Sequence, residues 1–205
     1  MSPGVNDIMS GPARLDTQMA FLREADQLKA VLRASRLIDG SRRENSAEHS
    51  WHVMLYALVL ADQAAPEVQI DRVIRMLLLH DLVEIDAGDA PIHGTIDHAA
   101  MAMKETAAAT RLFGLLPADQ AQAFRALWDE FEAAETPDAI FAKSIDRIQT
   151  PVANLASGGG TWVDYNVTLD QMDARVGTPV NRGTPRIWSW LRPQIKAFLG
   201  GSKTP

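Results

Sequence analysis

The 205-residue sequence contains no cysteine. Disulfide bonds, zinc–thiolate sites and thiol nucleophiles are therefore excluded. Any bound metal ion must be held by histidine and carboxylate side chains. The absence of cysteine also fits a reducing compartment.

The sequence also lacks a long apolar run and an excess of basic residues. Its longest apolar stretch, residues 53–61, is too short to cross a bilayer. Its first residues show no basic region followed by an apolar one, so no signal peptide is predicted. The formal net charge of −6 argues against general binding of a nucleic-acid polymer. These absences together predict a soluble, cytoplasmic protein that binds neither membranes nor nucleic acid.

The apolar residues that are present recur at helical spacing, and no convincing alternating strand is found. A chain of this length suits one domain. We predict a flexible tail at residues 1–14, rich in Gly, Pro, Ser and Asn, followed by a single all-α domain over residues 15–200. The motifs lie within about 20–155, and a C-terminal loop and helix are expected at 156–200.

Seven helices are expected, at about 16–35, 45–64, 70–85, 96–113, 118–134, 138–155 and 184–199. Asn45 and Glu48 have the spacing of a helix cap and its capping-box partner. Thr136 and Pro137 have the order of a cap followed by a first-turn proline. Pro151 is expected to kink or end its helix. Residues 157–168, which include three consecutive glycines, are expected to form a long loop, with residues 161–168 as a candidate short strand. The stretch 157–183 is expected to be peripheral to the domain.

The helix expected at 70–85 begins with apolar residues and ends with charged ones. His80, Asp81 and Glu84 share one helical face, so their side chains can converge. A buried charge is costly unless it is paired or ligates a metal ion. Neutral imidazole and carboxylate groups are good ligands for divalent cations. His49, in the first turn of another helix, and Asp146, inside an apolar helix, are candidates for the remaining ligands.

Ordinary alternatives exist for each of these residues. The charged end of the helix at 70–85 would also suit a helix terminus that opens into solvent. Asp146 would also suit an ion pair with Arg147 or Lys143.

Three segments resemble, in order and context, the metal-binding segments of the HD-domain phosphohydrolase superfamily, in particular its 5′-deoxynucleotidase-like branch. They are "ENSAEHSWHVMLYAL", "LLLHDLVEIDAGD" and "AKSIDRIQ". The resemblance implies an HD-domain helical bundle with one divalent metal ion (Mn, Co, Fe, Mg or Zn). It implies four metal ligands and two catalytic acids, namely His49, His80, Asp81 and Asp146 as ligands, Glu84 as the acid that activates water, and Asp89 as the acid near the leaving sugar oxygen.

The phosphate ligands are less clear in the sequence. Arg42, Arg43 and Lys143 are the predicted substrate-binding residues, because a guanidinium suits a phosphate and Lys143 shares a helical side with Asp146. The Arg-Trp pair that the bacterial deoxynucleotidases carry before the first ligand is missing here, and Arg33 or Arg36 are its candidate substitutes. Trp162 is the tryptophan that we consider as a base-stacking lid.

The resemblance implies phosphate release from nucleoside or deoxynucleoside 5′-monophosphates, and a homodimer. Three alternatives remain open at this point. The same centre would suit a phosphodiester or a nucleoside triphosphate. A di-iron oxygenase would require His52, His93 or His98 at a second metal ion. A non-catalytic scaffold would keep the metal ion for stability alone, but it would not require Glu84 and Asp89.

Overall fold

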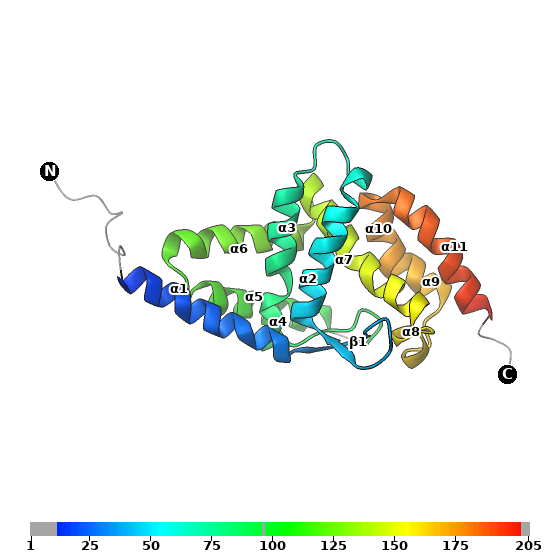
Figure 1. Cartoon of the computed structure of the whole chain (residues 1–205), viewed down its shortest axis with the longest axis horizontal. Coiled ribbons are helices and arrows are strands. Elements are labelled where there is room, and N and C mark those ends of the chain that lie inside the picture. Colours follow the sequence, from blue (N-terminus) through cyan, green and yellow to red (C-terminus); the bar gives the residue numbers. More distant parts are fainter. Residues whose placement is uncertain (1–11, 96, 202–205) are drawn as a thin grey trace.

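The computed structural model describes residues 12–95 and 97–201, and within them it is helical apart from one small hairpin (Figure 1). The predicted all-α fold is confirmed. Residues 1–11 of the predicted tail lie outside the described part of the chain, and α1 (Pro12–Ala25) already begins before its predicted end. No helix in the described ranges is long and apolar enough to cross a membrane.

The prediction of a helix up to residue 35 was wrong. After α1 and η2 (Asp26–Ala30), the chain forms strands β1 (Leu32–Arg36) and β2 (Arg43–Asn45), which pair antiparallel with an irregular register. Gly40, with a φ of 71°, lies in the connecting turn. The reason is tertiary: the Ala34 amide donates to the Asp89 carboxylate at 3.0 Å instead of to a helical carbonyl. The spacing of apolar residues along the sequence carries no information about such a long-range contact.

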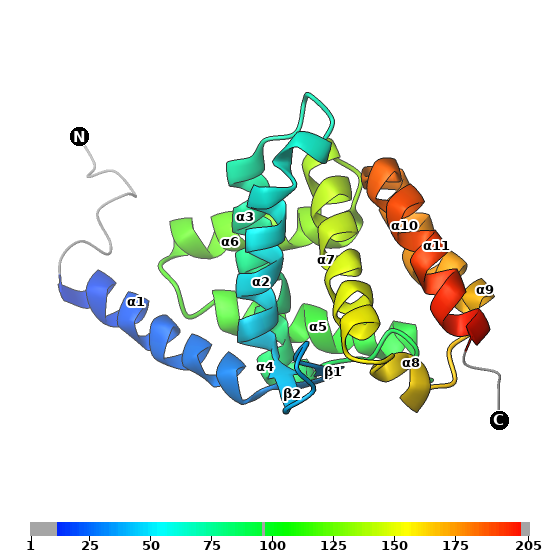
Figure 2. The ribbon, with the colours of Figure 1, turned by 45° about the vertical axis from the view of Figure 1, so that its right-hand side comes forward.

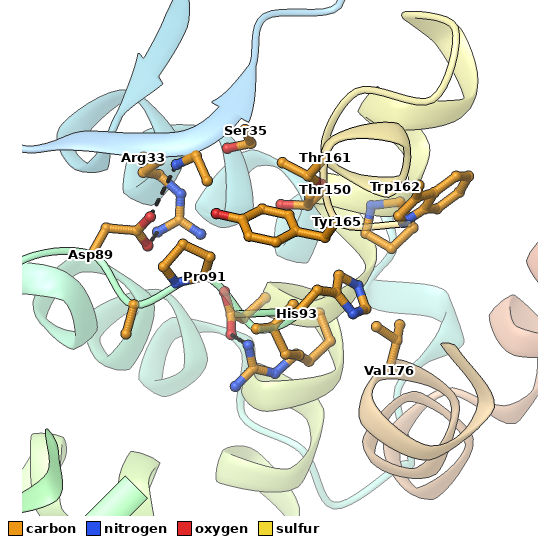
Figure 3. Close-up of a pocket in the computed structure, with 16 residues that line it drawn as sticks. Arg33, Ser35, Asp89, Pro91, His93, Thr150, Thr161, Trp162, Tyr165 and Val176 are labelled. Carbon is orange, nitrogen blue, oxygen red and sulfur yellow. Dashed lines mark hydrogen bonds and ion pairs between the residues drawn. The ribbon is translucent and has the colours of Figure 1, made fainter. Parts of the chain in front are cut away.

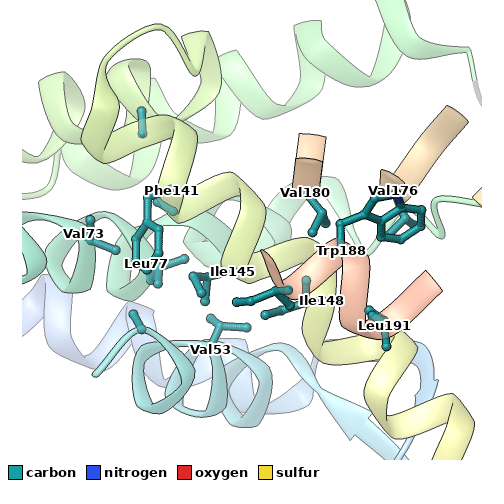
Figure 4. Close-up of a cluster of buried hydrophobic side chains, with 14 of the residues drawn as sticks. Val53, Val73, Leu77, Phe141, Ile145, Ile148, Val176, Val180, Trp188 and Leu191 are labelled. Atoms are coloured by element: carbon teal, nitrogen blue, oxygen red, sulfur yellow. The ribbon is translucent and has the colours of Figure 1, made fainter. Parts of the chain in front are cut away.

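The three central helices are α2 (Ser46–Val59), α3 (Ile70–Leu79) and α7 (Pro137–Ala156), which lie side by side in Figure 2. The α2 helix is followed by η3 (Ala61–Gln63), so it ends slightly earlier than predicted. The predicted capping box of Asn45 and Glu48 is present, and Thr136 caps α7 as predicted. The α7 helix continues through Pro151 to Ala156. The facing surfaces of these helices form the main core (Figure 4), which includes Val53, Leu77, Phe141, Ile145 and Ile148.

A second apolar cluster lies under α1, α5 (His98–Phe113) and α6 (Ala118–Ala133). Between α3 and α5 the chain forms η4 (His80–Val83) and α4 (Glu84–Ala87), whose apolar residues join this cluster. Asp86 on α4 forms an ion pair with Arg111 on α5, with Oδ1 and Nη2 2.6 Å apart. The ion pair and the apolar contacts therefore hold η4 and α4 against α5 and the second apolar cluster.

The predictions of a long loop at 157–168 and of a peripheral stretch at 157–183 were wrong. This segment contains α8 (Thr161–Asp164), α9 (Leu169–Met172), η5 (Asp173–Gly177) and α10 (Thr178–Gly183), and α11 (Pro185–Gly201) follows it. Met172 and Val180 are fully buried in the main core, and α10 packs against α7. The segment is therefore an integral part of the domain.

The three glycines at 158–160 form a tight turn between α7 and α8. All three have positive φ. A Cβ on Gly159 would lie 2.7 Å from the Phe198 ring, and one on Gly160 would overlap the side-chain oxygen of Asn154. The turn requires glycine at these positions, so it fixes the direction of α8.

The five tryptophans fall into two groups. Trp128, Trp162 and Trp188 are buried, whereas Trp51 on α2 and Trp190 on α11 are each 61% exposed. Trp51 and Trp190 therefore lie outside the core, and their exposed rings are accessible to a second copy of the chain. The homodimer itself stays a prediction.

Candidate metal centre

Three elements that are far apart in the sequence bring the predicted ligands together. His49 lies in the first turn of α2, His80 and Asp81 begin η4, and Asp146 lies midway along α7. One potential ligand atom of each of His49, His80 and Asp81 lies within 4.8 Å of the other two. All three residues are buried, His49 completely.

Asp146 completes the group. Its Oδ1 lies 3.0 Å from His49 Nε2 and 3.7 Å from His80 Nε2. His49 Nε2 is also 3.9 Å from Asp81 Oδ2. Burial alone would raise the pKa of Asp146, but Arg147, His49 and His80 outweigh it and hold that pKa well below its usual range. The four predicted ligands thus surround one small volume.

The hydrogen bonds of His80 decide which of its nitrogens faces this volume. Nδ1 lies 2.8 Å from the Leu77 carbonyl oxygen, which can only accept, so Nδ1 carries the proton. Nε2 is therefore the ring nitrogen that faces the volume, and in the neutral ring it has a lone pair. It is buried, has no hydrogen-bond partner within the described residues, and lies 3.0 Å from Asp81 Oδ1. An imidazole nitrogen this close to a carboxylate oxygen needs a proton or a metal cation between the two atoms. Two imidazoles and two carboxylates around one small volume form a donor set that fits a divalent metal ion.

The two predicted catalytic acids border the same volume. Glu84 accepts a short hydrogen bond from the Ser46 hydroxyl, and Asp89 accepts the Ala34 amide of β1. Burial raises the pKa of Glu84 well above its ordinary value, and the nearby charges of Asp81 and Asp89 raise it further. The two acids are held by different elements, one by α2 and one by β1.

Arg33 lies between these acids. Its Nη1 is 3.0 Å from Asp81 Oδ2, and 3.7 Å from both Glu84 Oε1 and Asp89 Oδ1. The guanidinium is largely buried, which alone would lower its pKa, but the surrounding carboxylates raise it. Of the two arginines considered as substitutes for the missing Arg-Trp pair, the structure brings Arg33 to the acids.

The three predicted phosphate-binding residues lie in different places. The Arg42 side chain is 53% exposed and pairs with Glu48, with Nη2 and Oε1 2.6 Å apart. Arg43 is exposed on β2 and lines neither of the cavities that reach the site. Lys143 lines the cavity over the metal centre, with Nζ 2.9 Å from Glu132 Oε1. Only Lys143 is therefore close to the site, and the phosphate role of Arg42 and Arg43 stays a prediction.

A model of the HD domain matches residues 25–188 of the chain. The chain belongs to the HD-domain family. A crystal structure of a predicted metal-dependent phosphohydrolase from Magnetospirillum magnetotacticum superposes on this HD domain with a TM-score of 0.85. The two sequences are 46% identical, and the match covers 94% of this chain and 99% of that one.

Curated relatives match a shorter region of this HD domain. The human 5′-deoxynucleotidase HDDC2 is 29% identical over 132 residues, which are 64% of this chain and 63% of the human protein. The 5′-deoxynucleotidase hdd1 of Schizosaccharomyces pombe is 27% identical over 134 residues, 63% of this chain and 66% of the yeast protein. The chain therefore spans about 63% of the length of the human relative.

Two further buried residues of the HD domain support the first histidine, and we did not predict them. Gln149 Oε1 lies 3.2 Å from His49 Nδ1, and the Gln149 amide donates to Glu44 at 3.0 Å. Asp146 and Glu44 raise the pKa of His49 to about 9, although burial and Arg33 work in the opposite direction. Gln149 follows Asp146 by three residues on one helical face, a spacing that was visible in the sequence. Glu44 had no such signal, because β2 was not predicted.

The remaining histidines are not part of the ligand group found within the described residues. His52 stacks on Trp51 and contacts Gln149. His93 and His98 line two different cavities beside the centre. The di-iron alternative would require at least one of them to join the four central residues.

Proposed function

We propose that this HD-domain protein is a metal-dependent phosphohydrolase that releases phosphate from nucleoside 5′-monophosphates, including deoxynucleotides. The names of its relatives support the proposal, since the human and yeast proteins are 5′-deoxynucleotidases and the bacterial one is a predicted metal-dependent phosphohydrolase.

The observation that carries the proposal is the buried Nε2 of His80. It has no hydrogen-bond partner in the described ranges, yet it faces the carboxylates of Asp81 and Asp146. His49, His80, Asp81 and Asp146 would hold one divalent ion, whose identity among Mn, Co, Fe, Mg and Zn is open. When bound, such an ion supplies Lewis acidity, which polarises a phosphoryl oxygen and makes water more acidic.

The acids of this chain divide the proton transfers. Glu84 is positioned by Ser46 and takes the proton of the attacking water. Asp89, fixed by the Ala34 amide, faces the leaving sugar oxygen. Arg33 lies beside both acids, and Arg147 and Lys143 line the same cavity, so the three cations offset the negative charge of a phosphate.

The test is phosphate release from a panel of nucleoside 5′-monophosphates with each metal ion added in turn. The panel should include a cyclic nucleotide and a nucleoside triphosphate, because their products separate the alternative hydrolases. Asp81→Ala should lose the activity, whereas Asp86→Ala, in the same segment but paired with Arg111, should keep it. Equal activity of Asp81→Ala and the parent protein would mean that the centre is assigned wrongly. A metal content near two iron atoms per chain would instead favour the oxygenase.

A further inference from the structure

The cavity at the metal centre has two parts that meet at Arg33, Asp89, Asp146 and Arg147. One part, the charged lobe, lies over Asp81 and Glu84 and is bordered by further ionisable groups, Glu105, Glu132 and Lys143. The other part, the neutral lobe, extends toward α8 (Figure 3) and is lined by Ser35, His93, Thr150, Thr161, Trp162 and Tyr165.

The two lobes differ in charge. Apart from the residues that it shares with the charged lobe, the neutral lobe is lined by no acid, lysine or arginine. It offers hydroxyl groups, proline and valine side chains, and aromatic rings instead. A ligand with a charged end and a neutral, aromatic end would match this contrast.

Tyr165 is the aromatic ring that reaches into the neutral lobe. Figure 3 shows it between Thr150 and Thr161 on one side and His93 on the other, with its hydroxyl directed toward Arg33 and Asp89. The Tyr165 residue is 38% exposed and lines the lobe, so it is not enclosed in the core. It directly follows α8, whose direction is set by the glycine turn at 158–160.

Trp162, which we considered as a base-stacking lid, does not have this freedom. It is only 2% exposed, and its ring lies 5.7 Å from that of Phe198 on α11. Trp162 therefore forms the floor of the neutral lobe, and Tyr165 occupies the position from which a ring could stack on a ligand.

His93 provides a polar group that lacks a partner. Its Nδ1 is buried and makes no hydrogen bond to the residues that the structure describes. The loop that carries it is anchored by Arg175, whose guanidinium donates to the Ile92 carbonyl at 2.8 Å. Burial, together with the charges of Arg175 and Arg147, lowers the pKa of His93 to about 4. The ring is therefore neutral near pH 7 and can accept or donate a hydrogen bond.

We propose that the neutral lobe binds the nucleoside part of the substrate, with the base stacked on Tyr165 and hydrogen-bonded to His93. The inference rests on the proposed nucleotidase function, because it assigns the sugar and base that accompany the phosphate. In this arrangement the phosphate lies toward the charged lobe, and the shared residues Arg33 and Asp89 lie at the junction with the sugar. Tyr165 thus determines specificity for a nucleotide over a simple phosphoester.

The test compares two substrates that differ only by the base, deoxyadenosine 5′-monophosphate and deoxyribose 5-phosphate. Stacking of a base on an aromatic ring is worth about 1–3 kcal/mol. Tyr165→Ala should therefore raise KM for the nucleotide by about 10-fold, equivalent to about 1.4 kcal/mol. It should leave kcat, and KM for deoxyribose 5-phosphate, unchanged. Tyr165→Phe keeps the ring and should retain the low KM. Val163→Ala is the matched control, because Val163 lies on α8 and is 60% exposed.

A binding measurement separates this inference from the proposed function. Deoxyadenosine, which has no phosphate to hydrolyse, should quench tryptophan fluorescence of the full chain, with about 10-fold weaker binding to Tyr165→Ala, as the same stacking energy requires. If the parent protein hydrolyses no phosphomonoester, the proposed function fails and deoxyadenosine binding alone decides the inference. If Tyr165→Ala shifts KM for both substrates alike, or for neither, the inference is overturned. Should Tyr165→Ala not fold, Tyr165→Leu keeps the apolar volume without the flat ring and must show the same selective loss.

Discussion

Replacing Arg33 by alanine tests the electrostatic balance of the centre. The guanidinium lies 3.0 to 3.8 Å from the oxygens of four acids, Asp81, Glu84, Asp89 and Glu44. At an effective dielectric constant of about 20, unit charges at such distances attract by about 4–5 kcal/mol per pair. Much of this attraction only repays the burial of the charges, so removing one partner costs about 3–5 kcal/mol. We therefore expect Arg33→Ala to lower the free energy of unfolding of the metal-free protein by that amount.

Two conditions should modify this loss. Arg33 lowers the pKa of Glu84, which burial raises, so removal of Arg33 favours protonated Glu84. The destabilisation should therefore be smaller at low pH, where Glu84 is neutral, than at high pH. A bound divalent ion would supply part of the missing positive charge, so added metal should reduce the loss. The unfolding midpoint in urea, measured with chelator and with Mn²⁺ at several pH values, reports both effects.

Arg42→Ala is the matched control, because this arginine pairs with Glu48 at the surface, where solvent and salt screen the pair. Its midpoint should equal that of the parent protein at every pH. If Arg33→Ala destabilised the metal-free chain no more than Arg42→Ala, Arg33 would not hold the acids together. The same conclusion would follow if the loss did not depend on pH.

Two other predictions concern the neutral lobe. Gly160→Ala should destabilise the fold by about 1–3 kcal/mol, because φ is 44° and the added Cβ would overlap Asn154. Gly200→Ala, which has open space around the added Cβ, should leave the stability unchanged. Thermal unfolding of the two variants measures the difference. His93 has a pKa of about 4 against an ordinary 6.5, so the folded chain binds fewer protons there than the unfolded one. The stability that this difference gives is present above pH 6.5 and is lost as pH falls toward 4, by about 1 kcal/mol after allowance for exposure of the half-buried ring. His93→Gln should therefore flatten the stability profile in that window, and an NMR titration that placed the pKa of His93 near 6.5 would contradict the argument.

The helices could be predicted where apolar periodicity and capping residues agree. Helices α5, α6 and α7 begin and end within a few residues of the expected positions, and Thr136 and Pro137 mark the start of α7. The hairpin could not be predicted, because the conformation of β1 depends on Asp89, 55 residues beyond Ala34. The short helices within residues 157–183 could not be predicted, because this segment is rich in glycine and polar residues and lacks apolar periodicity. Packing of α10 against α7 holds the segment in place.

The candidate site was predictable to the extent that helical spacing decides it. His80, Asp81 and Glu84 could be placed on one face from their offsets, and the family resemblance related them to His49 and Asp146. The positions of the arginine side chains could not be predicted, because they depend on the direction in which the strand or loop that carries each arginine faces. Arg33 points inward from a strand that was expected to be a helix, whereas Arg42 lies in the loop and pairs locally with Glu48.

The balance of charge in the centre supports a bound cation independently of the sequence motif. Five carboxylates, each with a side chain at most 11% exposed, surround the single buried guanidinium of Arg33, namely Glu44, Asp81, Glu84, Asp89 and Asp146. Buried charges of one sign are unfavourable unless they are compensated. The polypeptide alone compensates them with protons, which is why the pKa values of Glu84 and His49 are both raised. A divalent ion among the same atoms would supply the missing positive charge and leave Glu84 free to act as a base.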